Sequence, residues 1–247
     1  LLPEPGARVI ELGCGAAALA RRLLALHSGM RYLGLEVDRV QLARNLREVP
    51  GRMRFVEAGA QQIPEKAAQF DLALMLKSLH HVPVALMDQA LAEVARVLRP
   101  GGHLYVSEPV YGGAFNDVIK IYNDEGVVRA AAQAALDRAL AAAPSPWMQV
   151  AEERFATPVH YADFAEFERR MMHPTFAEHH ITDALRARTA AAFAPHCGAG
   201  GATFERGRVD RVPHLGGGGG DPVQGIGSRD IERLPLEVQV ADPFLPF

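Results

Sequence analysis

Residues 8–15 read RVIELGCG, a short apolar run that stops at two glycines. The aliphatic and β-branched residues at 8–12 predict a buried strand, and Gly13 and Gly15 predict a tight turn at its end. Residues 16–27 (AAALARRLLALH) are strong helix formers with leucines three or four positions apart, so a helix is expected to follow directly. The stretch therefore predicts a strand–turn–helix unit.

The same alternation continues along the chain. Strands are expected at 31–36, 53–57, 70–75 and 103–107, and helices at 40–49 and 84–98. Strands that alternate with helices predict an α/β fold, in which a mostly parallel sheet is covered on both faces. The RPGG turn at 99–102 is expected to end the last of these helices, because proline cannot continue a helix and glycine can adopt positive φ.

After Pro109 the pattern changes, and the sequence predicts three units: a core at 1–109, a helical cap with closing strands at 110–205, and a tail at 206–247. In the cap, helices are expected within 114–143, 163–172 and 181–193, with a break at 123–126 and a strand at 154–161. The alanine-rich segment 130–143 is expected to pack closely against another element.

The tail contains five consecutive glycines, Gly216–Gly220, and scattered prolines. Such a segment buries too little apolar surface to offset its ordering entropy, so disorder or an aberrant ending is expected, apart from a short strand at 236–240. Residues 201–205 are typical of the start of a last strand, but Arg206 interrupts its apolar continuation. A reading-frame change or gene-prediction artefact after residue 205 is one explanation.

Composition excludes several classes of protein. The chain has 247 residues, of which 49% are hydrophobic and 22% charged, and no apolar run approaches the roughly 18–20 residues of a membrane span. A net charge of -3 argues against nucleic-acid binding. The two cysteines are too few for a disulfide framework, so a cytoplasmic location is expected. The chain has neither an initiator Met nor a signal peptide, and a fragment lacking upstream residues is expected.

The first loop and an acidic residue predict the ligand. In open α/β sheets ligands bind beyond the carboxyl ends of the strands, where a glycine loop admits them. Glu36 closes the second strand about 20 residues after Gly15, which is the spacing of an acid that accepts hydrogen bonds from ribose hydroxyls. An adenosine-containing ligand is therefore expected. Asp38 competes for the ribose, but it can equally cap the next helix, so Glu36 is favoured.

Four segments then resemble a known family in order and spacing. They are VIELGCG at 9–15, GLEVD at 34–38, FDLALMLKSLHHV at 70–82 and VLRPGGHLYVSEP at 97–109. Together they resemble the class I S-adenosylmethionine-dependent methyltransferases over about residues 7–109, which implies a Rossmann-like, doubly wound sheet and S-adenosyl-L-methionine as cofactor. A dinucleotide dehydrogenase would favour glycine at position 18, where this chain has Ala18.

The resemblance also implies where the cofactor lies. The loop after the first strand would line its methionine part, the second strand end would hold its ribose, the loop after the third strand would meet its adenine, and the fourth strand end would run under the methionine. Many relatives have Asp where Gly59 stands, which leaves backbone groups and Gln61 to recognise the adenine. The residues implied are Glu11, Gly13, Cys14, Gly15, Glu36, Val37, Ala60, Gln61, Leu76 and Lys77.

A general base is needed only if the acceptor is a protonated oxygen or a carbon acid. His80, His81 and Tyr111 are the catalytic candidates, because they follow the fourth and fifth strands and histidine titrates near neutral pH. Adjacent side chains are expected to point apart, so only one histidine should face substrate. Other polar residues near the strand ends and in the cap could line the site, and for each of them a structural role is the alternative. They are Lys77, Glu108, Tyr122, His160, Tyr161, His173, His179 and His180.

No metal site is expected, because no acid or cysteine joins His173, His179 and His180 at ligand spacing. The LKSL segment at 76–79 lacks the signatures that mark nucleic-acid methylating and metal-dependent relatives. The sequence therefore predicts a metal-independent methyltransferase that acts on a small-molecule acceptor by in-line displacement. The alternatives are an NAD-type oxidoreductase and a non-catalytic cofactor-binding or truncated protein. The acceptor atom and the oligomeric state stay open.

Overall fold

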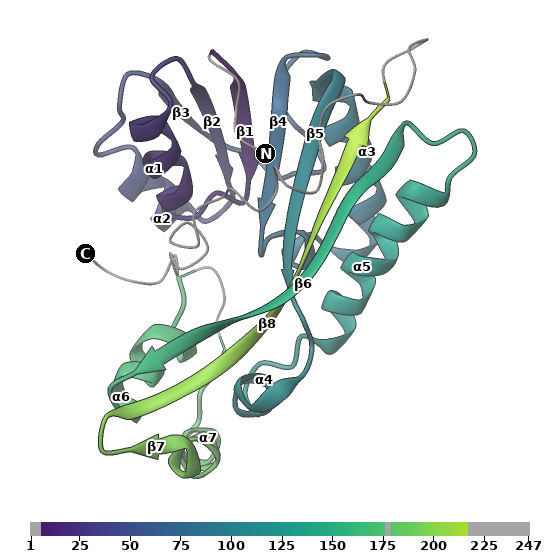
Figure 1. The fold of residues 1–247 in the computed structure, drawn as a ribbon. Coiled ribbons are helices and arrows are strands. Elements are labelled where there is room, and N and C mark those ends of the chain that lie inside the picture. Colours follow the sequence, from purple (N-terminus) through teal and green to yellow (C-terminus); the bar gives the residue numbers. More distant parts are fainter. Residues whose placement is uncertain (1–5, 176–178, 217–247) are drawn as a thin grey trace.

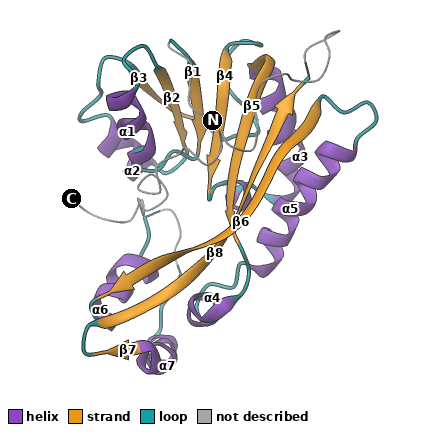
Figure 2. Cartoon of the chain, viewed as in Figure 1, coloured by secondary structure: helices purple, strands orange, loops and turns teal. Residues whose placement is uncertain are grey.

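The computed structural model describes residues 6–175 and 179–216, and its strands form one mixed sheet (Figures 1 and 2). The strands are β1 (Arg8–Leu12), β2 (Arg31–Glu36), β3 (Met53–Glu57), β4 (Phe70–Leu76), β5 (Leu98–Pro109), β6 (Trp147–Tyr161), β7 (Cys197–Gly198) and β8 (Gly201–Leu215). Their order is β3-β2-β1-β4-β5-β8-β6, with β7 paired to one end of β8.

Helices lie on both faces of this sheet and around the far end of β6 and β8 (Figure 2). The α-helices are α1 (Ala18–Leu26), α2 (Arg39–Asn45), α3 (Met87–Val97), α4 (Gly113–Ile119), α5 (Gly126–Ala141), α6 (Phe164–Phe167) and α7 (Asp183–Phe193). Short 3₁₀ turns are η1 (Leu79–His81), η2 (Val84–Leu86) and η4 (Ala194–His196), and η3 (Glu168–Met172) is a π-helical turn. No helix among the described residues is long and apolar enough to cross a membrane.

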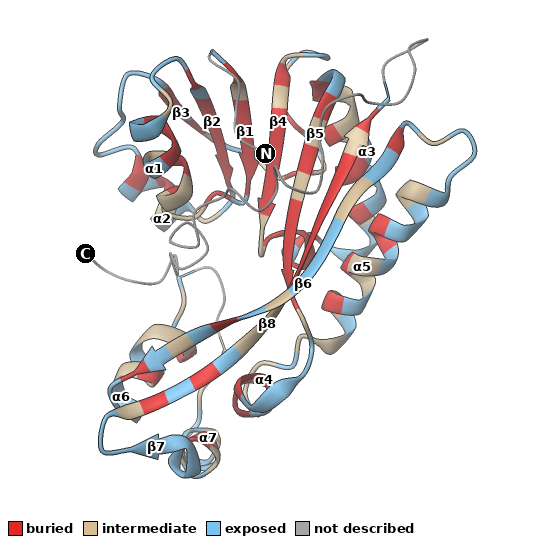
Figure 3. Cartoon of the chain, viewed as in Figure 1, coloured by how far each residue is buried: buried red, intermediate tan, exposed pale blue. Residues whose placement is uncertain are grey.

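The alternation of side chains along the strands separates two hydrophobic cores. Val9 and Leu74 pack with α1 on one face, whereas Ile10 and Met75 pack with α3 and α5 on the other. Neighbouring residues of a strand point to opposite faces, so a strand buried on both sides must be apolar at nearly every position. Figure 3 shows this burial along β1, β4 and β5. The predicted α/β fold is confirmed.

Strands β1 to β5 pair in parallel, and β8 is antiparallel to both β5 and β6. The carboxyl ends of the parallel strands therefore meet along one edge of the sheet. Strand order reverses between β1 and β4, so the crevice that such sheets use for ligands lies beyond the ends of these two strands.

Helix α5 belongs to the core rather than to a cap. Its Ala132, Ala135 and Leu136 are almost completely buried in the core beside α3. The small alanine side chains let the helix approach closely, as the alanine-rich pattern predicted. The boundary expected at 109/110 is therefore wrong for this helix, because the sheet face beside α3 needs a second helix to cover it.

The remaining helices of the expected cap form a separate lobe. Helices α4, α6 and α7 surround the ribbon of β6 and β8 where it extends past the carboxyl ends of the parallel strands (Figure 1). Aromatic side chains fill this lobe, among them Phe115, Tyr161, Phe167, Phe193 and Phe204.

The sequence predicted that the tail begins at Arg206. Instead, β8 runs without interruption from Gly201 to Leu215. Two of its charged residues pair with neighbouring strands: Asp210 accepts hydrogen bonds from the hydroxyls of Tyr105 and Ser107 on β5, and Arg211 donates to Gln149 on β6. Sequence pattern alone missed this strand because its charged residues find partners that are distant along the chain. Residues 217–247, where most of the expected tail and the strand at 236–240 fall, lie outside the described residues.

Other bounds differ by a few residues. The helix expected at 40–49 ends at Asn45, and β5 begins at Leu98 instead of residue 103. A register irregularity between Phe70 and Leu72 lets β5 begin before the glycine turn.

Replacement of Asp210 by Ala should destabilise the protein by about 1–3 kcal/mol, because two hydroxyls at the centre of the sheet lose their acceptor. Urea unfolding measures the loss. Asp137→Ala is the matched control, since Asp137 pairs with Arg211 but its side chain is 67% exposed, and the expected cost is about 0–1 kcal/mol. Equal losses for the two variants would contradict the role given to Asp210.

Candidate active site

The loop between β1 and α1 adopts a backbone that favours glycine. Gly13 has φ 71° and Gly15 has φ 50°. A Cβ on Gly13 would lie 2.8 Å from the Cβ of Ser78, whereas a Cβ on Gly15 would meet no atom within 4 Å. Gly13 thus permits close packing under the loop, and Gly15 leaves open space beside the backbone.

Glu36 points into the crevice beside this loop. Its Oε2 accepts a hydrogen bond from the Gly15 amide at 2.7 Å, and its Oε1 accepts from the amides of Val37 and Asp38 at 2.9 Å each. The side chain is 6% exposed. Three backbone donors therefore orient one carboxylate at the tip of β2, against the glycine turn.

Asp38 has a different role. Its Oδ1 accepts hydrogen bonds from the amides of Val40 at 2.9 Å and Gln41 at 3.3 Å, so it caps α2. Its Oδ2 accepts from the Thr175 hydroxyl at 2.5 Å. Of the two acids weighed for the ribose, the structure places Glu36 at the loop.

Asn45 was missed by the sequence analysis. Its Nδ2 donates to the Gly15 carbonyl at 2.6 Å from the last residue of α2, and the residue is 3% exposed. A polar residue on the buried face of a predicted helix, three positions after Leu42, was the available signal. Asn45 and Glu36 together hold the carbonyl and the amide of one glycine.

Glu11 is buried beneath the loop. Its Oε2 accepts a hydrogen bond from the Tyr32 hydroxyl at 2.5 Å. Burial raises the pKa of Glu11 to about 8, although the bond from Tyr32 opposes this shift, and the nearby charge of Glu36 adds to it. Burial, followed by the charges of Glu11 and Glu36, also raises the pKa of the Cys14 thiol. Glu11 and Cys14 support the crevice from below.

The loop after β3 brings Gln61 over Gly59. A Cβ on Gly59 would lie 2.5 Å from Oε1 of Gln61, so the amide side chain occupies the space that a longer residue at 59 would take. Ala60 is buried between them, and the Gln61 carbonyl accepts from Gln89 at 2.9 Å. The Gln61 side chain thus fills the space beside Gly59.

The segment after β4 turns sharply. Lys77 has φ 58°, and its amide donates to the Ser107 carbonyl of β5 at 2.7 Å, while Leu76 is partly buried. Ser78 is 8% exposed, and its Oγ has no hydrogen-bond partner among the described residues. A buried hydroxyl under the glycine loop is thereby left to bind something else.

His80 forms a buried pair with Glu108. The Nδ1–H of His80 donates to one carboxylate oxygen of Glu108, and the Leu79 amide donates to the other at 2.9 Å. The side chains of His80 and Glu108 are 2% and 1% exposed. Glu108 therefore fixes the orientation of the ring, and Nε2 becomes the free nitrogen.

His81 lies beside His80 rather than pointing away. The ring centroids are 4.1 Å apart. The expectation that adjacent side chains diverge holds for a strand, but η1 is a 3₁₀ turn, whose side chains are about 120° apart. Desolvation, and then the neighbouring His80, lower the pKa of His81 to about 4, so the ring is neutral at pH 7.

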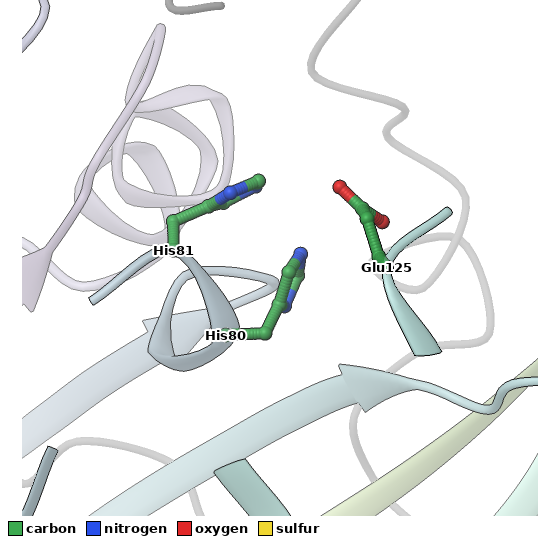
Figure 4. A group of neighbouring side chains, drawn as sticks. All are labelled: His80, His81 and Glu125. Carbon is green, nitrogen blue, oxygen red and sulfur yellow. The ribbon is translucent and has the colours of Figure 1, made fainter. Parts of the chain in front are cut away.

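Glu125, just before α5, completes this cluster (Figure 4). Arg129 donates two hydrogen bonds to its Oε2, at 2.6 and 3.1 Å. Burial raises the pKa of Glu125, but the charges of His80 and Arg129 outweigh burial and hold it below its ordinary value. One ligand atom from each of His80, His81 and Glu125 lies within 4.8 Å of the others. The sequence analysis missed Glu125, because no spacing links it to the histidines.

Tyr111 lies outside this cluster. It is 45% exposed, and its hydroxyl donates to Asp124 at 2.9 Å. The other polar candidates lie in the lobe: His160 contacts Thr203, Tyr161 is buried in the aromatic cluster, and Tyr122 packs beside His179. His173 and His180 are exposed.

A small cavity lies behind Arg129, between β5, α4 and β8. Phe115, Asn116 and Arg206 contribute to its wall, and its volume of about 10 Å³ has room for about one water molecule.

The sheet order and the crevice define a class of protein, the Rossmann-like α/β proteins that bind a nucleoside at the strand ends. Comparison with known proteins narrows this class. Residues 9–102 match a family model described as a methyltransferase domain. These residues form a domain of the class I S-adenosylmethionine-dependent methyltransferases.

Two curated relatives and one solved structure illustrate the likeness. A fatty-acid O-methyltransferase of Mycolicibacterium smegmatis is 36% identical over 42% of this chain and 37% of its own length. The methyltransferase GfsG of Streptomyces halstedii is 36% identical over 46% of this chain and 41% of its own length. The YcgJ protein of Bacillus subtilis has a TM-score of 0.60 at 14% identity, covering 87% of this chain and 94% of that one. The chain spans less than half the length of these curated relatives.

Replacement of Glu11 by Gln should change how stability depends on pH. The pKa of Glu11 in the folded protein, about 8, exceeds the ordinary value of 4.5. Ionisation of Glu11 therefore does not affect the stability of the wild type below about pH 4.5, and it lowers that stability progressively as pH rises to 8. The loss is about 1.4 kcal/mol per pH unit within this window. The variant cannot ionise at this position, so its stability relative to wild type should rise between pH 5.5 and 8.

Urea unfolding at several pH values measures this difference. Glu57→Gln serves as the control, because the Glu57 side chain is 48% exposed and its partner Arg39 is 82% exposed. Its difference from wild type should be flat across the same range. A flat difference for Glu11→Gln as well would show that Glu11 ionises normally in the fold.

Proposed function

We propose that the chain transfers a methyl group from S-adenosyl-L-methionine to a small-molecule acceptor that carries an ionisable oxygen or carbon acid. The observation that carries this proposal is the pairing of two sites at one sheet edge: the Glu36 carboxylate beside the glycine turn, and the buried His80–Glu108 pair beyond β4. The methyltransferase domain and the small-molecule enzymes among the relatives support it.

The residues of the crevice fit the donor. Oε2 of Glu36 has one amide donor and keeps a lone pair for a ribose hydroxyl. The open space beside Gly15 admits a ligand against the backbone, and the buried Ser78 hydroxyl has a hydrogen bond to give to the methionine part. Gln61, with Ala60 and Val37, borders the place proposed for the adenine, and Val37 is 64% exposed there.

The bound donor supplies an activated methyl group on a sulfonium. The chain contributes position, because holding the acceptor in line with the methyl group can lower the barrier by about 7–11 kcal/mol. Leu76 and Lys77 shape the crevice between the two sites, and the turn at Lys77 directs the following residues toward the acceptor.

His80 is proposed as the general base. Its Nδ1–H is bonded to Glu108, so Nε2 can take a proton from the methyl acceptor. The buried Glu108 carboxylate stabilises the imidazolium that forms. His81, neutral at pH 7, and Glu125 line the same opening. The transfer proposed here has no metal step, and Tyr111 keeps only an outer place at the mouth.

The alternatives are less well supported. An NAD-type oxidoreductase is not favoured, since the domain match is to methyltransferases and Ala18 replaces the third glycine of a dinucleotide loop. A non-catalytic cofactor-binding protein would bind the donor without turnover. A cytoplasmic location is proposed with the enzyme, because Cys14 and Cys197 are both free thiols.

Replacement of Glu36 by Ala should weaken the binding of S-adenosylhomocysteine by about 10- to 100-fold, since hydrogen bonds to a charged carboxylate are lost. Isothermal titration measures the affinity. Asp38→Ala removes the cap of α2 without removing the ribose acceptor, so it should bind within a few-fold of wild type. The proposal fails if Glu36→Ala binds as tightly as wild type.

Replacement of His80 by Asn should lower kcat by about 10²- to 10⁴-fold and leave donor affinity unchanged. Asparagine keeps an N–H donor for Glu108 but does not take up a proton near pH 7. Release of S-adenosylhomocysteine, followed over a panel of hydroxylated and carboxylated small molecules, identifies the acceptor and then measures kcat. His196→Ala, an exposed histidine of the lobe, is the control and should retain the full rate.

Donor binding without turnover on any acceptor would favour the non-catalytic alternative. A rate for His80→Asn equal to that of wild type would show that the reaction needs no base at this position.

A further inference from the structure

His80, His81 and Glu125 lie together at one opening, although Glu125 is far from the histidines along the chain. Both histidines come from η1, and Glu125 comes from the turn before α5, with its carboxylate facing the two rings (Figure 4). The three groups offer two imidazole nitrogens and one carboxylate oxygen within 4.8 Å of one another.

Two of these three ligand groups, His80 and Glu125, are held by further side chains. The Nδ1–H of His80 is taken by Glu108, which leaves Nε2 as the nitrogen free to bind. Oε1 of Glu125 accepts from Asn123 at 3.0 Å, and Oε2 accepts from Arg129 at 2.6 Å. In metal sites the ligating histidine usually donates its other ring N–H to a carboxylate, and a ligating carboxylate accepts further hydrogen bonds. These contacts fix the orientation and the tautomer of the histidine ring.

The charge of the cluster favours a cation. Glu108 and Glu125 carry two negative charges, and Arg129 supplies one positive charge. The two carboxylates outnumber the one guanidinium, and Glu108 is almost completely buried, where an uncompensated charge is costly. A bound cation would balance it.

The types of ligand indicate which cation would bind. Two imidazoles and one carboxylate suit late first-row divalent ions such as Zn²⁺ and Co²⁺, whereas Mg²⁺ and Ca²⁺ prefer oxygen ligands. With metal–ligand distances of about 2.0–2.2 Å, the ligand atoms of a tetrahedral ion lie about 3.4 Å apart, so atoms that are up to 4.8 Å apart here would approach by as much as about 1.4 Å on binding. A change of rotamer at His81, the exposed member of the cluster, would bring its nitrogen closer to the other two ligand atoms.

We propose that His80, His81 and Glu125 form a binding site for one late first-row divalent cation, with at least one coordination position open to solvent. This site does not depend on the proposed methyl transfer, because the resting protein would bind the ion without donor or acceptor. A bound ion would occupy the His80 nitrogen that is otherwise the general base, so cation and proton would compete for one atom.

Cobalt is the spectroscopic probe that tests this site. Untagged, chelator-treated full-length protein carrying Cys197→Ser, so that its exposed thiol binds no metal, is titrated with Co²⁺. One equivalent should bind and give a visible d–d absorption band, and Zn²⁺ should displace it stoichiometrically. Zn²⁺ should also raise Tm.

Two variants and one control assign the ligands. His81→Ala and Glu125→Gln in the same background should each weaken cobalt binding by at least tenfold and abolish the Zn²⁺-dependent rise in Tm. His196→Ala, an exposed histidine outside the cluster, should bind as the parent does. His81→Ala decides the matter if Glu125→Gln does not fold.

The proposal is overturned if the parent gives no cobalt band, or if His81→Ala binds cobalt as tightly as the parent. Neither result would affect the proposed methyl transfer, whose test is the affinity of Glu36→Ala for S-adenosylhomocysteine.

Discussion

The hydrogen bond from the Gly15 amide to the Glu36 carboxylate joins the tips of β1 and β2 and sets the geometry of the crevice. Gly15 can make it only because its backbone adopts positive φ, which costs a residue with a side chain more than it costs glycine. Asn45 holds the carbonyl of the same residue from α2. The loop is thus fixed on both sides before any ligand arrives, which reduces the ordering cost of binding.

The second half of the site depends on buried charge. Glu108 is almost completely buried at the end of β5, where an unpaired carboxylate would be costly, and the His80 ring and the Leu79 amide are its partners. The same pairing that makes burial tolerable also orients His80 toward the opening. Stability and chemistry therefore impose the same arrangement on these residues, and Lys77 keeps a rare positive φ in the turn between them.

The ribbon of β6 and β8 connects this site to the lobe. β8 lies between β5 and β6, with Asp210 bonded to β5 and Arg211 bonded to β6, and its far end carries the aromatic cluster of α4, α6 and α7. The contact of Thr175 with Asp38 brings the lobe back to the core next to Glu36. Residues that are distant from the glycine loop in sequence therefore lie beside it in the fold.

The sequence by itself determined the parallel core and indicated the glycine loop with an acidic residue beside it. The apolar strands at 8–12, 31–36 and 70–75, the glycines after the first and the acid closing the second are local patterns, and the rules of parallel sheets place their ends at one edge. What only the tertiary structure decided involves partners distant along the chain. β8 continues past Arg206 because Asp210 finds Tyr105 and Ser107, α5 joins the core because the sheet face beside α3 must be covered, and Glu125 reaches the histidines because α5 packs there. Such pairings leave no periodic signal, since each depends on which surfaces meet and not on spacing along the chain.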